Sequence, residues 1–287
     1  MRRPRRPTFS ILLPTHNRSD VLPYAIRSVQ AQSRSDFELL VVGDGCTDDT
    51  AEVVASFDDR RIRWFDLPKA PNFGYANRNI ALREARGELI AFAAHDDLLF
   101  PDHLERLAPY FDDPRIDLAY SRPLWGTPDG TLVPSAFNLH IHDVMGEFVS
   151  MMRNEIPASC VVHRRSCFDR VGYWDADLAK GGDWDMWVRI LNIGNRDNFA
   201  FHPQPTTIHF RANWRTAGPG FVKQGQERIR SAPDGLSIDV AGVTEQSAIW
   251  EAIDADGGGW PDRVRTAVVR ELDSRVRDAD RFERRLQ

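Results

Sequence analysis

The stretch Ala91-Phe92-Ala93-Ala94-His95-Asp96-Asp97 decides the fold, because an apolar run ends there abruptly in two adjacent carboxylates. The run predicts a buried strand, and a strand that stops in acidic residues holds them at the carboxyl edge of a sheet, where open α/β folds bind ligands. Two anions so close together repel each other unless a cation or a hydrogen-bonding ligand lies between them. The stretch therefore predicts a divalent metal that carries a phosphate, with an acidic helix N-cap before Pro101-Asp102 as the alternative.

Short apolar strands, each followed by a helical segment, precede this stretch. Strands are predicted at residues 9–14, 37–42 and 62–65, and helices at residues 20–32, 47–57 and 75–85. Strand and helix alternate four times within about a hundred residues, which predicts a parallel sheet with right-handed crossovers. The expected fold class is therefore α/β.

The pattern changes after Pro114. Further strands are predicted at residues 118–121 and 158–163, a turn at 127–131, and a loop followed by a helix within 135–160. A Gly-rich loop at 181–182 leads into an amphipathic helix. From Val264 to Leu286 an apolar stripe at spacings of three and four predicts a C-terminal helix, which either packs on its own domain or forms a homodimer.

Composition limits the possible functions. A chain of 287 residues with 42% hydrophobic content can bury a core and fits one large α/β domain with an appendage. No apolar run approaches the roughly 20 residues that cross a bilayer, and the N-terminus lacks the core of a secretion signal, so a cytoplasmic location with at most peripheral membrane contact is expected. The net charge of −5 argues against nucleic acid as a partner. Cys46, Cys160 and Cys167 form no zinc pattern and are expected to be reduced.

Three ordered motifs resemble those of a known family. Residues 9–18 (Phe-Ser-Ile-Leu-Leu-Pro-Thr-His-Asn-Arg) resemble the opening strand and Pro-Thr-x-Asn loop of family 2 glycosyltransferases, which have the GT-A fold. Residues 41–50 resemble the family's Asp-Asp-Gly-Ser-Thr-Asp segment, and residues 72–79 its Gly-x-x-x-Arg-Asn element. The resemblance extends over residues 8–211 and implies helices on both faces of the sheet, a nucleoside diphosphate sugar as donor (UDP-sugar favoured), and inverting transfer to a hydroxyl acceptor.

The resemblance also implies which residues contact the donor nucleotide. Asp44 would accept a hydrogen bond from the base, although a turn residue is the alternative. Arg78 would bind the nucleotide or orient the acidic loop, with a helix-surface salt bridge as the alternative. The full set of expected nucleotide-binding residues is Pro14, Thr15, Asn17, Asp44, Arg78, Asn79, His95 and Asp96.

The acidic loop departs from the Asp-x-Asp element of the family. Ala94 stands where the first aspartate is usual, His95 takes the variable position, and Asp96 matches the last aspartate. The resemblance therefore implies Mn²⁺ or Mg²⁺ on Asp96 with phosphate oxygens as further ligands, and His95 in place of the lost aspartate. His209 resembles a late histidine that some members bring to the metal; a packed histidine is the alternative.

The expected general base is Asp183, which matches the aspartate of the family's Glu-Asp motif, with Gly182 where glutamate is common. Such a carboxylate deprotonates the acceptor hydroxyl as it attacks the anomeric carbon. N-capping of the following helix is the alternative role, and Asp185 is the competing base. Trp184 and Trp187 are candidates for an apolar platform under the acceptor, with core packing as the simpler role for Trp187.

The expected domains are a basic disordered tail (1–7), a nucleotide-sugar-binding half (8–115), an acceptor-binding half of the same domain (116–215) and a C-terminal extension (216–287). Expected acceptors are a glycan, a lipid-linked intermediate or a small molecule, as in cell-envelope glycoconjugate synthesis. One alternative is a catalytically degenerate protein, because Gly43, Ala94 and Gly182 each replace an expected acid. A sugar nucleotidyltransferase is a weaker alternative, since the loop after the first strand contains no glycine.

Overall fold

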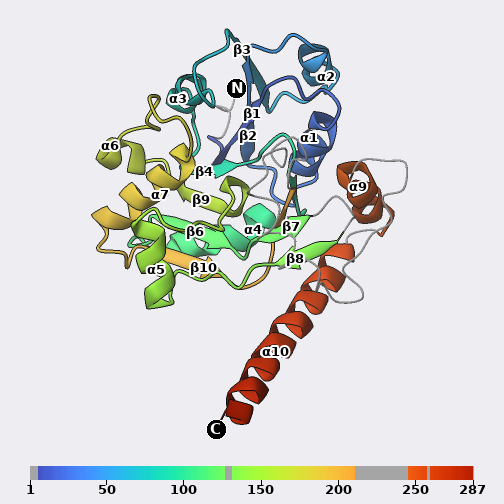
Figure 1. Cartoon of the computed structure of the whole chain (residues 1–287). Coiled ribbons are helices and arrows are strands. Elements are labelled where there is room, and N and C mark those ends of the chain that lie inside the picture. Colours follow the sequence, from blue (N-terminus) through green and yellow to red (C-terminus); the bar gives the residue numbers. More distant parts are fainter. Residues whose placement is uncertain (1–5, 127–130, 211–244, 257–258, 287) are drawn as a thin grey trace.

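A seven-stranded sheet forms the centre of the computed structural model, which describes residues 6–126, 131–210, 245–256 and 259–286 (Figure 1). The strand order is β10-β6-β9-β4-β1-β2-β3, and all neighbours are parallel except the two pairs that involve β9. The mostly parallel sheet predicted from the sequence is confirmed. Its strands are β1 (Phe9–Thr15), β2 (Phe37–Asp44), β3 (Ile62–Leu67), β4 (Leu89–Phe92), β6 (Leu118–Ser121), β9 (Val161–Arg164) and β10 (Phe199–His202).

Helices cover both faces of this sheet, because successive strand residues point to opposite faces. Ile11 and Leu13 of β1 pack in one hydrophobic cluster, whereas Leu12 packs in the other. Each fully buried leucine or isoleucine contributes about 1.5–3 kcal/mol to stability. The first face carries α1 (Leu22–Gln30), α2 (Thr50–Ala55) and α4 (His103–Leu107); the second carries α3 (Tyr75–Arg83), α5 (His142–Val149), α6 (Cys167–Val171) and α7 (Gly182–Ile193).

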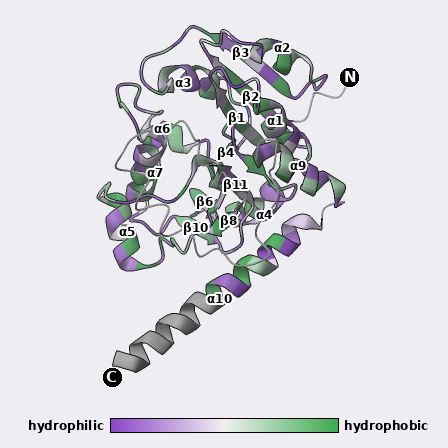
Figure 2. Cartoon of the chain, turned by 45° about the vertical axis from the view of Figure 1, so that its right-hand side comes forward, coloured by the Kyte–Doolittle hydropathy of each residue, from purple (hydrophilic) through white to green (hydrophobic). Residues whose placement is uncertain are grey.

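A second sheet, which the sequence did not predict, carries the C-terminal helices. Its strands lie in the order β5-β11-β7-β8. They are β5 (Leu98–Leu99), β7 (Leu124–Gly126), β8 (Leu132–Pro134) and β11 (Thr207–Phe210). Helices α9 (Glu245–Ala255) and α10 (Trp260–Leu286) bury Ile249, Val264 and neighbouring side chains against this sheet. The predicted C-terminal helix is confirmed, and α10 extends away from the rest of the molecule in both ribbon views (Figures 1 and 2).

Two local predictions differ from the structure. The helix expected to follow the cap at residues 47–50 and run to about Phe57 ends at Ala55; in the turn before it, Asp48 Oδ1 accepts hydrogen bonds from the backbone N–H and the hydroxyl of Thr50. The strand expected at 158–163 starts with a 3-10 turn, Ala158–Cys160, and becomes β9 only at Val161. A second 3-10 turn, Ala108–Asp112, follows α4.

Several sequence predictions concern other parts of the chain. Residues 127–130 of the turn predicted at 127–131 and residues 1–5 of the basic tail lie outside the described residues, and the domain boundaries stay predictions. The three cysteines are free.

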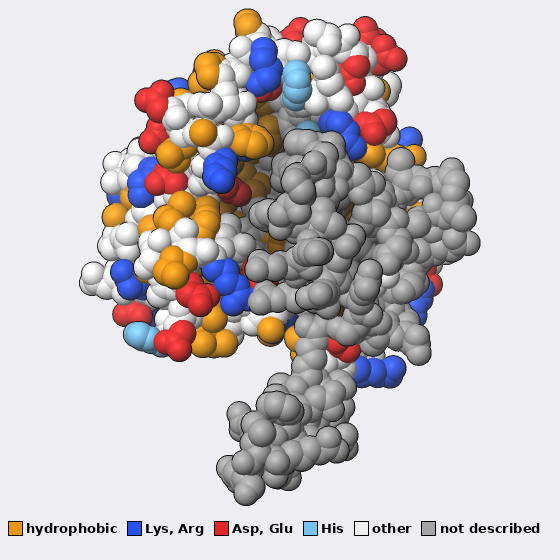
Figure 3. All heavy atoms as spheres, in the orientation of Figure 1, with side chains coloured by type: hydrophobic (Ala, Val, Ile, Leu, Met, Phe, Trp, Pro, Cys, Tyr) orange, Lys and Arg blue, Asp and Glu red, His pale blue; other side chains and the backbone are white. Residues whose placement is uncertain are grey.

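None of the described helices combines the length and the apolar character that crossing a membrane requires. On the coloured part of the face in Figure 3, basic and acidic side chains are interspersed.

Candidate active site

The carboxyl ends of β1, β2 and β4 meet at one edge of the large sheet. In the register of the sheet, Thr15 of β1 lies opposite Gly43 of β2, and Leu12 lies opposite Phe92 of β4. The loop after β1, the loop after β2 and the acidic loop therefore leave the sheet side by side. This edge is the position where open α/β sheets bind their ligands.

The loop after β1 is tied to the loop after β2. Pro14 and Thr15 are the last two residues of β1, in the predicted position at the edge. Asn17 has a positive φ of 50°, which an asparagine tolerates better than most residues. Its Oδ1 accepts a hydrogen bond from the backbone N–H of Thr47 at 2.7 Å, and its Nδ2 donates to the Thr47 hydroxyl at 3.2 Å. The side chain of Asn17 thus holds the two loops together.

Asp44 ends β2, and its carboxylate is surrounded by hydrogen-bond donors. Lys69 Nζ donates to Oδ2 at 2.6 Å, while the backbone N–H of Ala70 and Nδ2 of Asn77 donate to Oδ1 at 2.8 and 2.7 Å. The residue is only 8% exposed, so these bonds compensate the cost of burying the charge. Asp44 therefore organises the segment between β3 and α3, and its predicted contact with the base stays a prediction. Sequence reasoning missed Lys69 and Asn77.

Packing explains the glycine that replaces an acid before Asp44. A Cβ atom at Gly43 would lie 2.3 Å from the ring of Trp64 on the neighbouring strand β3, a distance that real Cβ atoms do not reach. The indole of Trp64 therefore occupies the space that an aspartate side chain would need. Gly74, with a positive φ of 71°, likewise brings its backbone against the Asp44 carboxylate, where a Cβ would approach Oδ2 to 2.5 Å.

Helix α3 carries the predicted nucleotide residues Arg78 and Asn79, and both contact Trp174. The Arg78 guanidinium lies over the rings of Tyr75 and Trp174, at 5.1 and 5.0 Å from their centroids. Asn79 donates from Nδ2 to the Trp174 carbonyl at 2.7 Å and accepts from the Trp174 N–H at 3.1 Å. These contacts fix α3 to the segment before α7. The nucleotide-binding roles of Arg78 and Asn79 stay predictions.

The acidic loop follows β4 and places its two aspartates in different surroundings. Asp96 is 5% exposed, and no described residue donates a hydrogen bond to its carboxylate; His95 Nε2 lies 3.9 Å from its Oδ1. Asp97 is 2% exposed and accepts from the Ser159 hydroxyl at 2.6 Å. The structure thus leaves Asp96, and not Asp97, with a buried carboxylate that lacks donors among the described side chains.

His209 reaches the acidic loop, but it bonds to Asp97. Its Nδ1 lies 2.8 Å from Asp97 Oδ1, and the backbone N–H of Phe210 contacts the same oxygen at 3.3 Å. A carboxylate on one ring nitrogen fixes the tautomer and orientation of an imidazole, so that the other nitrogen can serve as a ligand atom. The sequence interpretation did not assign Asp97 or Ser159, since only the folded chain brings these distant positions together.

A magnesium or manganese ion fits this loop chemically. Both metals are bound mainly by oxygen atoms, and both often rely on phosphates and water to complete their coordination. Asp96 would supply a carboxylate and His209 a second ligand. Within the described part of the chain, no group of three or more His, Cys, Asp or Glu side chains is placed to hold a metal ion. A diphosphate and water would therefore have to supply most of the coordination sphere.

Asp183 lies in the first turn of α7, half-buried and without a hydrogen bond or ion pair to any described residue. The competing base, Asp185, is engaged with Arg189 one turn later at 2.9 Å. The N-cap position belongs to Gly181, so N-capping does not account for Asp183. These contacts favour Asp183 as the available carboxylate.

Gly182 connects this turn to the nucleotide side of the edge. Its N–H donates to the Tyr75 hydroxyl at 3.0 Å, and a Cβ at this position would lie 2.7 Å from the Tyr75 ring. Tyr75 therefore excludes the glutamate that is common at this position. The two tryptophans differ: Trp187 is 1% exposed in the core, as the simpler interpretation predicted, whereas Trp184 is half-buried and donates from Nε1 to the carbonyl of Phe148.

The sequence matches a family model over more than half of the chain. The model described as glycosyl transferase family 2 matches residues 10–166. The chain belongs to glycosyl transferase family 2. The region that matches the family contains Asp44, Arg78, Asn79 and the acidic loop, whereas Asp183 and His209 lie beyond it.

Curated relatives of this glycosyltransferase family cover part of the chain. The uncharacterized glycosyltransferase YwdF of Bacillus subtilis is 28% identical over 184 residues, which are 63% of this chain and 66% of YwdF. The GalNAc(5)-diNAcBac-PP-undecaprenol beta-1,3-glucosyltransferase of Campylobacter jejuni is 38% identical over 106 residues, which are 35% of this chain and 33% of that enzyme. The chain therefore matches just under two thirds, or less, of the length of these relatives.

Solved structures show the same fold. TarS of S. aureus (residues 1–349), in complex with UDP-GlcNAc, superposes with a TM-score of 0.58 at 19% identity, covering 72% of this chain and 59% of TarS. The mannosyltransferase PcManGT from Pyrobaculum calidifontis, in complex with GDP-Man and Mn2+, gives a TM-score of 0.54 at 16% identity, covering 94% of this chain and 76% of that protein. The predicted GT-A fold is thereby confirmed.

Proposed function

We propose that this family 2 glycosyltransferase moves a sugar from a nucleoside diphosphate sugar, with UDP-sugar favoured, to a hydroxyl acceptor, with inversion and with the help of a divalent metal. The observation that carries the proposal is the buried Asp96 carboxylate, which has no donor among the described residues and lies at the same sheet edge as Asp44. A buried anion without donors is costly, and a cation compensates that cost. The fold of UDP-GlcNAc- and GDP-Man-bound neighbours supports a nucleotide sugar as the ligand.

The residues at the carboxyl edge of the large sheet would have different roles in binding the nucleotide sugar. The loops after β1 and β2, joined by Asn17, would hold the nucleoside, and His95 would contact the ribose or the diphosphate where Ala94 replaces an aspartate. Asp96 and His209 would hold the metal, with Asp97 orienting the imidazole. When bound, the metal would neutralise the negative charge that develops on the leaving diphosphate.

Asp183 would perform the proton transfer. Its carboxylate takes the proton of the acceptor hydroxyl while that oxygen forms a bond to the anomeric carbon. The bond between the anomeric carbon and the diphosphate oxygen breaks, and its electron pair leaves with the nucleotide. Because the attack comes from the face opposite the leaving group, the product has the inverted configuration. Asp185 is less suited, since its carboxylate already pairs with Arg189.

The alternative of a catalytically degenerate protein was based on three residues that replace expected acids, and the structure explains two of them by packing. Gly43 and Gly182 replace acids at positions where Trp64 and Tyr75 fill the space of a side chain. These glycines are thus explained by packing and do not indicate a decayed site. Ala94 remains, and His95 beside it supplies a polar side chain.

The acceptor side carries exposed apolar side chains. Trp184 packs against α5, and both ends of α5 expose hydrophobic residues, with Ile141 51% exposed before it and Met152 77% exposed after it. Hydrophobic side chains show over this part of the molecule in Figure 3. An acceptor with an apolar portion, such as a lipid-linked glycan, fits these features better than a small polar molecule.

Calorimetry tests the donor proposal directly. UDP, GDP, CDP and dTDP are titrated with and without Mn²⁺ into the wild type, Asp96→Asn and the control Asp113→Asn, whose exposed pair with Arg115 lies far from the edge. We expect one diphosphate to bind in a metal-dependent manner, unchanged in the control and weakened at least about tenfold in Asp96→Asn. If the wild type binds none of the four, the proposal is wrong.

Asp183→Asn tests the catalytic role. We expect transfer to fall by about 10²-fold or more, as for the loss of a general base, while nucleotide binding stays unchanged. Asp185→Asn is the matched control, because it removes a neighbouring carboxylate that pairs with Arg189. Full turnover in Asp183→Asn would assign the base to another residue.

A further inference from the structure

The C-terminal helices contact the acidic loop directly. Gln246, in the first turn of α9, donates from Nε2 to the backbone carbonyl of Asp96 at 3.2 Å, and the residue is only 6% exposed. The two residues are 150 positions apart in the chain. The carbonyl that receives this bond belongs to the residue proposed to hold the metal, so its position sets where the Asp96 side chain begins.

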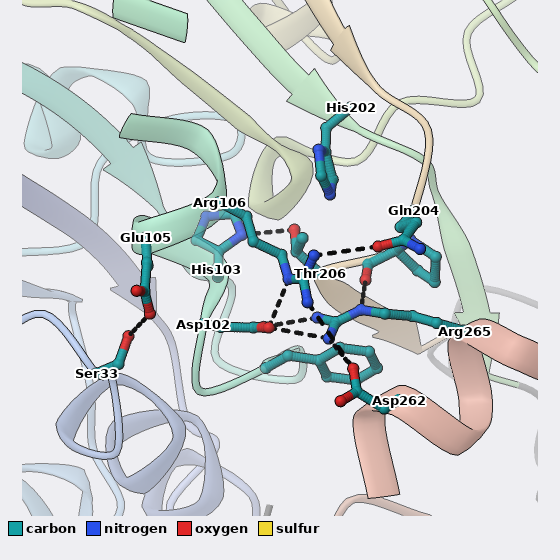
Figure 4. A network of polar contacts seen from close by, with 12 residues as sticks. Ser33, Asp102, His103, Glu105, Arg106, His202, Gln204, Thr206, Asp262 and Arg265 are labelled. Atoms are coloured by element: carbon teal, nitrogen blue, oxygen red, sulfur yellow. Dashed lines mark hydrogen bonds and ion pairs between the residues drawn. The ribbon is translucent and has the colours of Figure 1, made fainter. Parts of the chain in front are cut away.

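A second contact lies six residues further along the chain, beyond β5, at the N-cap residue of α4 (Figure 4). Arg265 of α10 donates to both carboxylate oxygens of Asp102, from Nη1 to Oδ2 at 2.9 Å and from Nη2 to Oδ1 at 2.6 Å. Its Nε donates to the carbonyl of Pro205, and its side chain is 4% exposed. Burial would raise the pKa of Asp102, but hydrogen bonds from Arg265 and Arg106 outweigh it and hold that pKa below its usual value.

Apolar packing completes the attachment between these two polar contacts. The ring of Phe100 meets the indole of Trp260 edge to face, with centroids 5.8 Å apart, and lies under the Arg265 guanidinium. Phe100 is fully buried in the cluster that joins β5 and β11 to α9 and α10. The segment from Asp96 to Asp102 is therefore held along its length by the C-terminal helices.

We propose that α9 and α10 position the acidic loop for metal and diphosphate binding, with Gln246 as the positioning residue for Asp96 and the Arg265–Asp102 pair as the anchor. We call Gln246, Asp102 and Arg265 the C-terminal clamp. The inference rests on the proposed function, since it assumes that Asp96 serves the metal. Asp97 is fixed separately by Ser159 and His209, so the clamp acts on the other half of the acidic pair.

Gln246→Met tests the clamp, because methionine has a similar size and lacks the donor. Hydrogen exchange of the metal-free protein is followed in peptides that cover residues 93–100. We expect faster exchange in these peptides than in the wild type, and unchanged exchange in peptides from β1 and β2. Gln30→Met is the matched control, since Gln30 of α1 bonds to Asp59 and the substitution removes a glutamine bond that does not involve residues 93–100. Equal exchange of residues 93–100 in Gln246→Met and wild type would overturn the proposal.

Nucleotide binding gives a second readout that a general loss of stability would not produce. For Gln246→Met, we expect the Mn²⁺-dependent affinity for the diphosphate to fall about fivefold, while metal-free affinity stays the same. An equal loss with and without Mn²⁺ would contradict a role at the metal. Arg265→Lys keeps the charge but not the two-pronged contact, and we expect faster exchange around residue 102.

The outcomes separate the clamp from the proposed function. If the wild type binds none of the diphosphates but Gln246→Met still speeds exchange at residues 93–100, the positioning of the loop holds and the metal–nucleotide function is wrong. If the wild type binds a diphosphate with Mn²⁺ and Gln246→Met matches it in both exchange and binding, the clamp is wrong and the function stands.

Discussion

The candidate site has a base side, formed by the loops after β1 and β2, and an acidic side, formed by the acidic loop after β4. The contacts that hold the two sides differ strongly in sequence separation. On the base side, Asn17 bonds to Thr47 at a separation of 30 residues, and Asp44 bonds to Lys69 and Asn77 at separations of 25 and 33. On the acidic side, Asp97 bonds to His209 at a separation of 112 residues, and Asp96 and Asp102 bond to the C-terminal helices at separations of 150 and 163.

This difference suggests how the site forms. Each of these three base-side contacts closes between neighbouring strand and helix units, so we expect the loops after β1 and β2 to order once the first half of the sheet has folded. The acidic side requires β11, α9 and α10 to dock first. We therefore expect base-side changes to affect nucleotide binding with or without metal, and acidic-side changes to affect only its metal-dependent part.

Among the substitutions that test whether the two sides act separately, we expect the largest loss of Mn²⁺-dependent nucleotide affinity for Asp97→Asn. The substitution removes the charge that orients His209 but keeps the shape of the side chain. Loss of such an orienting carboxylate typically weakens metal binding about 10- to 100-fold. We expect a loss of this size in calorimetry with Mn²⁺ and no loss of metal-free nucleotide binding. A similar weakening without metal would show that the two sides are not separate.

The next effect concerns pH, because two histidines with lowered pKa values, the buried His103 and the half-buried His202, lie near the Asp102–Arg265 pair (Figure 4). Burial, reinforced by His202, lowers the pKa of His103 to about 3, with Asp102 acting in the opposite direction. Burial, with Arg106 and Arg265, lowers the pKa of His202 to about 4. A histidine with a lower pKa in the folded chain takes up its proton first in the unfolded chain, so stability is lost as the pH falls below about 6.5.

Urea unfolding at pH 7 and pH 5 measures this loss. A fully buried histidine that stays neutral at pH 5 costs on the order of 2 kcal/mol of stability relative to pH 7. We expect His103→Gln to lower stability at pH 7 but to lose about 2 kcal/mol less than the wild type between the two pH values. His142→Gln is the control, since His142 is fully exposed. An unchanged pH dependence in His103→Gln would mean that His103 takes up its proton as readily in the folded chain as in the unfolded chain.

The same difference in contact range explains what the sequence could predict. The strand–helix alternation before residue 93 predicted four of the seven strands of the large sheet, and the motifs placed Asp44 and Asp96 at its edge, whereas β10 was not predicted. The second sheet was missed because β5 has two residues and β7 three, too few to show a period. Ser159 and Gln246 carried no local signal, because each acquires its role only through a partner that is distant in the sequence.

The residues that pack against Gly43 and Gly182 could not be predicted either, because they too are distant in the sequence. The sequence showed that Gly43 and Gly182 depart from the family pattern, but only the structure shows that Trp64 and Tyr75 fill the vacated space. His209 was predicted as a metal ligand; it lies at the acidic loop, bonded to Asp97, and its metal role stays a prediction. The sequence interpretation did not assign its partner, Asp97, because the family register pointed to Asp96 as the functional carboxylate.

The smallest loss of nucleotide affinity is expected for a substitution on the base side. Lys69→Met removes one of the three donors to Asp44 and keeps the length of the side chain. Lys69 is 45% exposed on its side chain, so the lost ion pair is expected to cost no more than about 1 kcal/mol, or about fivefold in affinity. We expect calorimetry to show this loss equally with and without Mn²⁺. The matched control Lys180→Met changes an exposed lysine in the loop before α7 and should leave both affinities unchanged. A loss that appears only with Mn²⁺ would place Lys69 on the diphosphate and move the boundary between the two halves of the site toward β2.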